Sequence, residues 1–165
     1  MGIIKLGFIS LIVFALLITG ISLFIPSHIL ISKAIDINAS KDSVMQQIAN
    51  AANWKQWYPG ADTSAFYMEA EKIKGIVTND KQILMISEAT DSTVVTINVG
   101  PNSRRGGSGW NIFSGNTPNT ITVQWYMDFK LRWYPWEKFS SLLLEKRYGP
   151  IMENGLQKLK DLLEN

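Results

Sequence analysis

Residues 120 to 136, TITVQWYMDFKLRWYPW, alternate between apolar and polar side chains over an unusual length. Every second position from Ile121 to Trp133 is apolar, and the positions between them carry Thr, Gln, Tyr, Asp, Lys and Arg. Successive side chains of a β-strand leave opposite faces of the sheet, so this alternation predicts a strand with one buried face. At roughly 3.3 Å per residue the run would extend about 45 Å, well beyond an ordinary strand of about 5 to 6 residues. Such a strand needs a bent sheet and a partner along its apolar side, either a packed helix or a cavity that holds a ligand.

The first segment of the chain is suited to the interior of a lipid bilayer rather than to water. Residues 6–25 include no charged side chain, and 20 residues match the hydrocarbon core of a bilayer, about 30 Å thick at about 1.5 Å rise per residue. We predict an uncleaved transmembrane helix that ends at Pro26. A cleaved signal peptide is the alternative, but it requires an apolar stretch of about 7 to 15 residues and a small-x-small cleavage site, which ISLFIPSHIL does not supply. The predicted division is therefore an anchor over 1–26 and one folded domain over 27–165.

Composition excludes several classes of function. The net charge of +2 arises from 16 basic and 14 acidic residues without a basic stripe, so we expect no nucleic-acid partner. The absence of cysteine excludes disulfides, thiol catalysis and cysteine metal sites, and the single histidine, His28, removes most other metal or general-base schemes. We expect no metal and no cofactor, and we interpret His28 as a polar residue at the level of the lipid headgroups.

The rest of the chain predicts one helical region near the start, a run of strands and a helical C-terminus. Ser40 is the expected N-cap of a helix over 41–53. The helical pattern at the C-terminus contains Pro150, which predicts two segments, 136–147 and 149–163. Turn residues separate the expected strands, which are 27–38, 64–77, 81–89, 92–99, 108–113 and 119–134. This order predicts an α+β fold in which a curved antiparallel sheet wraps a long C-terminal helix.

Aromatic residues supply the strongest candidate binding surface. The chain has six tryptophans, five tyrosines and seven phenylalanines, and large flat side chains can line a pocket for an apolar ligand or simply fill a core. Both interpretations stay open for Trp125 and Phe129, and Trp54 and Trp57 can equally form a lid over one end of the core. The candidate ligand-binding residues are Trp54, Trp57, Trp110, Trp125, Met127, Phe129, Trp133, Met152 and Leu156.

Two further stretches could contact lipid. The loop GPNSRRGGSG at 100–109 is interpreted as a flexible hairpin connection, with headgroup contact by Arg104 and Arg105 as the alternative. The stretch RWYPWEKF at 132–139 could lie at a membrane interface, where amphipathic aromatic side chains collect. The carboxylates on the expected strands show no spacing typical of a catalytic pair, so we assign no catalytic residue.

Both ends of the domain resemble a known family. AIDINASKDSVMQQIANAANWKQWYPG is similar to the opening of START-like proteins of the SRPBCC superfamily, also described as polyketide cyclase/dehydrase and lipid transport proteins, and GPIMENGLQKLK is similar to their closing helix. The resemblance covers about residues 28–163. It implies a helix-grip fold with an apolar cavity between sheet and helix, and it implies no particular reaction.

From these features we expect a membrane-anchored domain that binds a hydrophobic small molecule or lipid without catalysis. A cyclase- or hydrolase-like enzyme using the same cavity is one alternative, and a structural interaction module of an envelope complex is another; no protein partner is identified. Bacterial members with one N-terminal membrane helix are familiar, so the expected location is the bacterial inner membrane. The short N-terminal tail favours an extracytoplasmic domain.

Overall fold

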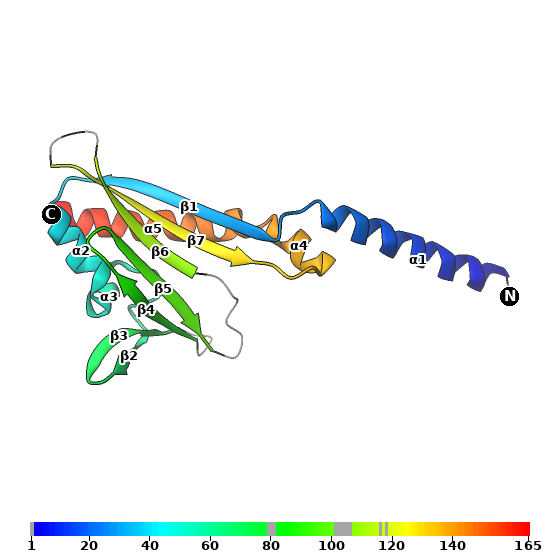
Figure 1. Cartoon of the computed structure of the whole chain (residues 1–165), viewed down its shortest axis with the longest axis horizontal. Coiled ribbons are helices and arrows are strands. Elements are labelled where there is room, and N and C mark those ends of the chain that lie inside the picture. The colour runs from blue at the N-terminus through cyan, green and yellow to red at the C-terminus, as the bar shows by residue number, and fades with distance from the viewer. Residues whose placement is uncertain (1, 79–81, 101–106, 116, 118) are drawn as a thin grey trace.

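The computed structural model describes residues 2–78, 82–100, 107–115, 117 and 119–165 (Figure 1). Five α-helices, one short 3₁₀ helix and seven strands follow one another along this part of the chain. In order they are α1 (Gly2–Leu23), β1 (His28–Ile37), α2 (Lys41–Ala49), η1 (Ala51–Asn53), α3 (Trp54–Trp57), β2 (Ala65–Glu69), β3 (Lys72–Val77), β4 (Ile83–Ala89), β5 (Thr93–Val99), β6 (Gly107–Ser114), β7 (Ile121–Lys130), α4 (Pro135–Ser141) and α5 (Leu144–Glu164).

The seven strands form one curved antiparallel sheet in the order β1-β7-β6-β5-β4-β3-β2. Strands β2 to β7 lie side by side in sequence order. The first strand, β1, pairs with the last, β7, over ten residue pairs. Helix α5 runs along the concave face beside β1 and β7, from the α1 side of the domain to the opposite end (Figure 1). The fold is therefore the predicted α+β helix-grip arrangement with one apolar N-terminal helix.

The alternation predicted for the last strand along the chain, β7, is confirmed over a shorter length than predicted. Val123 and Trp125 are fully buried on the concave face of β7, and the residues between them lie on the opposite face. On β1 the predicted apolar face is also turned inward, with Ile31 and Ile37 buried. The strand ends at Lys130 rather than at residue 134, so Trp133 lies beyond the sheet.

Two further predictions of element boundaries were also wrong. Residues 64–77 form a hairpin of two strands rather than one strand, because Ala70 and Glu71 take left-handed backbone conformations with φ of 48° and 63°. The C-terminal helical region is interrupted at residues 142–143, and α5 continues through Pro150. Proline near the start of a helix removes one backbone hydrogen bond, and the buried stripe along α5 is long enough to keep the helix continuous.

The expected helix over 41–53 is shorter than predicted. Ser40 is its N-cap, since the Ser40 side chain accepts a hydrogen bond from the Ser43 backbone N–H at 3.2 Å. Helix α2 ends at Ala49, and η1 and α3 continue the chain in two separate turns. Trp54 and Trp57, the first and last residues of α3, are both buried in the core.

Helix α1 has 22 residues and a mean hydropathy of 2.5 over its most apolar window. It projects away from the domain (Figure 1). Almost all of its side chains are exposed. By length and composition it could cross a membrane, and a signal sequence has the same features. It is not the core helix of a soluble domain, because only 6% of that window is buried.

Candidate functional site

Four of the candidate residues form one packed cluster, which we call the tryptophan end of the concave face. It consists of Trp54 and Trp57 on α3, Trp110 on β6 and Trp125 on β7, each at most 1% exposed. Trp110 and Trp125 lie directly opposite each other on neighbouring strands, with ring centroids 5.4 Å apart. The centroids of Trp54 and Trp57 lie 5.9 Å and 5.7 Å from that of Trp110. Such distances are typical of favourable aromatic contacts, so these rings fill the interior at this end.

Most indole N–H groups of the cluster are hydrogen bonded. Trp54 Nε1 donates to the Ile48 carbonyl at 2.8 Å, and Trp125 Nε1 donates to Ser108 Oγ at 3.0 Å. Trp110 Nε1 is buried and has no partner among the described residues. An unsatisfied buried donor costs roughly 1–3 kcal/mol, so Trp110 is a point in the core where an added acceptor would be stabilising.

Helix α5 closes the tryptophan end. Met152 and Leu156 are buried against the sheet, and Gly155 lies between them on the helix. A Cβ atom on Gly155 would lie 2.8 Å from Trp125 Cζ3 and from Pro59 Cδ. The close approach of α5 to the indole ring therefore requires glycine at this position.

The concave face is less covered near α1, where we define the open end as Ile29, Met127, Phe129 and Tyr148. These side chains pack against the core but are only partly buried. Ile29 and Phe129 are directly opposite each other on β1 and β7, and the Phe129 ring contacts Tyr148 of α5 with centroids 5.1 Å apart. The open end begins at the second residue of β1, close to the point where α1 enters the domain. The apolar wall thus continues past the cover provided by the tryptophans.

A charged contact joins β1 to α5 beside this open end. Lys33 Nζ lies 2.8 Å from Glu145 Oε1 and 3.0 Å from Glu153 Oε1. Its side chain crosses Gly149, where an added Cβ would lie 3.2 Å from Lys33 Cε. Hydrogen bonds to Glu145 and Glu153 raise the pKa of Lys33 above its ordinary value of 10.5. The contact therefore links α5 to β1, the edge strand of the sheet.

Tyr58 packs among the tryptophans. Its ring centroid is 5.3 Å from that of Trp125 and 5.5 Å from that of Trp54. Burial, and to a smaller extent the neighbouring Tyr148, raise the pKa of Tyr58 well above its ordinary value of 10.0. The phenol therefore stays neutral in the folded domain, which is consistent with an apolar interior.

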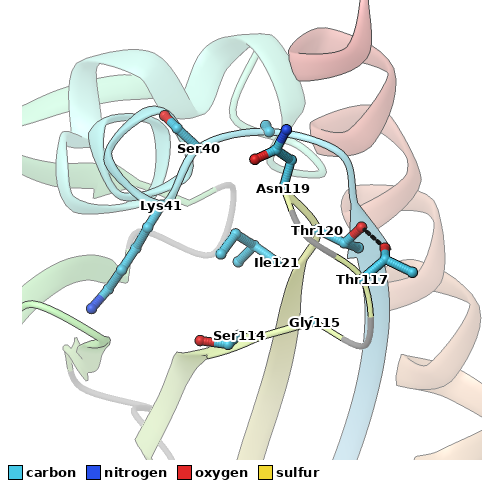
Figure 2. Close-up of a pocket in the computed structure, with 9 residues that line it drawn as sticks. Ser40, Lys41, Ser114, Gly115, Thr117, Asn119, Thr120 and Ile121 are labelled. Atoms are coloured by element: carbon cyan, nitrogen blue, oxygen red, sulfur yellow. Dashed lines mark hydrogen bonds between the residues drawn. The ribbon is translucent and has the colours of Figure 1, made fainter.

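A separate hollow of about 480 Å³ lies at the end of the sheet away from α1, between the β1–α2 and β6–β7 connections (Figure 2). Ser, Thr and Asn side chains dominate its walls, and Lys41 is the charged residue beside it. The hydroxyl groups of Thr117 and Thr120 are hydrogen bonded to each other (Figure 2). It is lined by Ala39, Ser40, Lys41, Ser114, Gly115, Thr117, Asn119, Thr120 and Ile121. None of the candidate residues lies in this hollow, and sequence reasoning did not identify it because hydroxyl-rich turns are common wherever strands connect.

Eight of the nine candidate ligand residues lie on the interior of the domain, and their role as ligand contacts stays a prediction. Trp133 is the exception, because it follows β7 and is 65% exposed. Ile29 and Tyr148 belong to the open end but were not among the candidates. Their signal was present in the alternation of β1 and in the apolar stripe of α5.

The polar candidates are dispersed. His28 pairs with Asp128 across β1 and β7, on the face of the sheet away from α5. Arg104 and Arg105 lie outside the described residues, whereas Gly107 to Gly109, expected in the same loop, belong to β6. Among the residues that the structure describes, no group of three or more His, Asp or Glu side chains could hold a metal ion.

Comparison with known proteins agrees with this architecture. The family model described as "Polyketide cyclase / dehydrase and lipid transport" matches residues 28–164. No curated protein matches the chain in sequence.

Solved structures share the fold at low sequence identity. An uncharacterised protein from Bacillus thuringiensis is 16% identical, with a TM-score of 0.61 over 83% of this chain and 100% of that one. The protein XoxI from Bacillus cereus is 16% identical, with a TM-score of 0.60 over 82% of this chain and 96% of that one. The di-domain aromatase/cyclase StfQ of the steffimycin biosynthetic pathway is 9% identical, with a TM-score of 0.61 over 83% of this chain and 51% of that one.

Proposed function

The chain belongs to the polyketide cyclase/dehydrase and lipid transport family, and from that premise we propose that it binds a hydrophobic small molecule or lipid without chemical change. The observation that carries the proposal is the open end, where Met127 and Phe129 continue the apolar wall but stay partly exposed. A ligand with an apolar body would complete the burial of these side chains, a gain of about 25 cal/mol per Å² of surface removed from water.

The ligand contacts we propose fall into two groups. Met127 and Phe129 on β7 and Ile29 on β1 would touch the ligand from the sheet. Tyr148 would touch it from α5. Trp54, Trp57, Trp110, Trp125, Met152 and Leu156 would form the inner wall against which the ligand stops, with contact limited to the rim of the cluster.

We further propose that α1 spans a membrane and that residues 27–165 form the single folded domain beside it. The open end begins at Ile29, so a ligand could enter near the bilayer, where apolar molecules are concentrated. The compartment we propose is the extracytoplasmic side of a bacterial inner membrane.

The test titrates residues 27–165 with fatty acids and phospholipids and follows tryptophan emission. The variant Trp133→Phe/Trp136→Phe serves as the background, so that the signal comes from the four buried tryptophans. We expect a saturable shift in emission, because a ligand at the open end alters the surroundings of Trp125. An unchanged spectrum across fatty acids, phospholipids and uncharged aromatic compounds would contradict the proposal.

A further inference from the structure

The outer face of α4 and its flanks is strongly apolar and exposed. We call Trp133, Trp136, Phe139, Leu142 and Leu143 the platform. Trp133 and Trp136 are 65% and 67% exposed, and Leu142 and Leu143 are 65% and 64% exposed. A cluster of large apolar side chains at such exposure on one short segment is typical of an interaction surface rather than of random exposure.

The aromatic part of the platform has a defined shape. Tyr134 stacks on Trp136 with ring centroids 4.7 Å apart and planes 7° from parallel, and its centroid lies 5.0 Å from that of Trp133. Tryptophan and tyrosine are the residues that collect at the boundary between lipid headgroups and hydrocarbon. The three packed rings therefore present an amphipathic surface. Because they are already ordered by these contacts, contact with lipid would cost little further side-chain entropy.

The inner face of α4 is attached to the segment that leaves α1. The Lys138 ammonium group donates to the Ile25 carbonyl at 2.7 Å and to Ser27 Oγ at 2.6 Å, although the residue is only 4% exposed. Ser141, one turn later, is buried on the same face and donates to the Lys138 carbonyl. Helix α4 lies beside the end of α1 in Figure 1. Hydrogen bonds thus attach the platform's helix to the segment that directly follows α1.

The charge around the platform suits a lipid surface. Residues 130–147 contain five basic and two acidic side chains. Four of the basic residues, Lys130, Arg132, Lys146 and Arg147, are exposed at the two ends of this segment. Cations beside an apolar interfacial segment are attracted to anionic headgroups at about 1 kcal/mol each near the surface.

We propose that the platform rests in the headgroup region of the bilayer that α1 crosses, with the open end of the concave face held against that surface. Trp133 follows the last residue of β7 by three positions, and Tyr148 lies within the first turns of α5, so platform and open end are neighbours. We commit to the lipid surface as the occupant, because Lys138 attaches α4 to residues 25–27, directly after the apolar helix α1, and because exposed basic side chains flank the platform. This inference rests on the proposed function in one respect, which is that α1 spans a membrane.

The test uses the full chain in nanodiscs of phosphatidylcholine and phosphatidylglycerol. Half of the samples contain phosphatidylcholine brominated near the carbonyl end of an acyl chain, since bromine quenches nearby tryptophan emission. Four of the six tryptophans are buried, so Trp133 and Trp136 should carry the quenched emission. We expect quenching in the wild type and its loss in Trp133→Phe/Trp136→Phe.

Other outcomes would overturn the inference. Equal emission from brominated and plain nanodiscs would place the platform away from lipid, and quenching that survives in the double variant would assign it to other tryptophans. If Trp133 and Trp136 were protected from both bromine and aqueous acrylamide, a protein surface would be the occupant. Co-elution of the chain with nanodiscs is recorded separately, so a failure of α1 to insert is distinguished from a failure of the platform.

A second variant tests the role of Lys138 in positioning. Lys138→Met removes both hydrogen bonds to residues 25–27 and should lower the bromine quenching at least twofold while the chain stays in the nanodisc. Lys158→Met is the matched control, because Lys158 is exposed on the far part of α5. Equal quenching in the two variants would exclude Lys138 as the positioning residue.

Discussion

At the tryptophan end of the concave face, α5 approaches the sheet so closely that Gly155 lies against Trp125, and four indole rings are withdrawn from water. At the open end, the same strand and the same helix leave Phe129 and Tyr148 in contact with each other but only partly covered. Both ends are apolar and both belong to β7 and α5. The difference lies in what covers them: α3 supplies two tryptophans at one end, and no described element does so at the other. Burial at the first end supports stability, whereas at the second end the apolar surface stays partly exposed.

The largest expected effect comes from breaking the tryptophan end. Trp125→Ala in residues 27–165 should lower the free energy of unfolding by about 3–5 kcal/mol, because it empties a fully buried site. Urea denaturation measures the change. Trp136→Ala is the matched control and should stay within about 0.5 kcal/mol of wild type, since Trp136 is exposed. Similar losses in the two variants would contradict the full burial of Trp125 at the tryptophan end.

A smaller effect is expected from the contact between α5 and the cluster. Gly155→Ala should destabilise by about 1–3 kcal/mol, because the new methyl group would overlap Trp125 and Pro59. Gly149→Ala on the same helix meets only the flexible ends of Lys33 and Glu145 and gains helix propensity, so it should be nearly neutral. Thermal unfolding of both variants gives the comparison. A neutral Gly155→Ala would show that α5 is not held closely against Trp125.

The third prediction concerns the open end. Phe129→Ala should weaken the binding of a hydrophobic ligand about tenfold, which corresponds to about 1.4 kcal/mol, and should cost less stability than Trp125→Ala. The measurement is the titration of tryptophan emission with the tightest fatty acid or phospholipid found. Thr120→Ala in the polar hollow is the control and should leave affinity unchanged. If Thr120→Ala weakened binding and Phe129→Ala did not, the ligand would lie at the opposite end of the sheet.

The smallest effect is a pH dependence at the packed end. Burial raises the pKa of Tyr58 in the folded domain, whereas the unfolded chain ionises near 10.0. The contribution of Tyr58 to stability is therefore complete below pH 10 and is lost as pH rises further, by up to about 1.4 kcal/mol per pH unit. The difference in unfolding free energy between wild type and Tyr58→Phe, measured from pH 7 to 11, should change only above pH 10. Lys33, whose pKa is also raised, is present in both proteins and cancels. A constant difference would place Tyr58 in water.

Much of the fold followed from local patterns in the sequence. Alternation from Ile121 to Phe129 predicted β7 and its inward face, and Ser40 marked the start of α2. The hairpin at Ala70 and Glu71 was missed because neither residue is a usual turn former, and its left-handed backbone is set by the pairing of β2 with β3. Pro150 predicted a kink or a restart of the helix, but the buried stripe of α5 extends across it.

The sequence predicts which side chains of β7 share the concave face, but not the difference in burial between its two ends. Alternation gives Trp125 and Phe129 the same face of β7 and the same expected role. Their different burial depends on α3, which is distant in sequence, and on the missing side chain of Gly155. Tertiary packing of this kind leaves no periodic signal in one strand. Likewise, Trp133 lies outside the sheet and is exposed because β7 ends at Lys130.

The most direct test of hydrophobic ligand binding at the open end is native mass spectrometry of residues 27–165, purified without detergent. Solvent extraction then identifies any released molecule. We predict an apolar adduct at a stoichiometry of about one per chain in the wild type, and its loss in Phe129→Ala while the fold is retained. A bare mass for the wild type, or an adduct that persists unchanged in Phe129→Ala, would contradict the account.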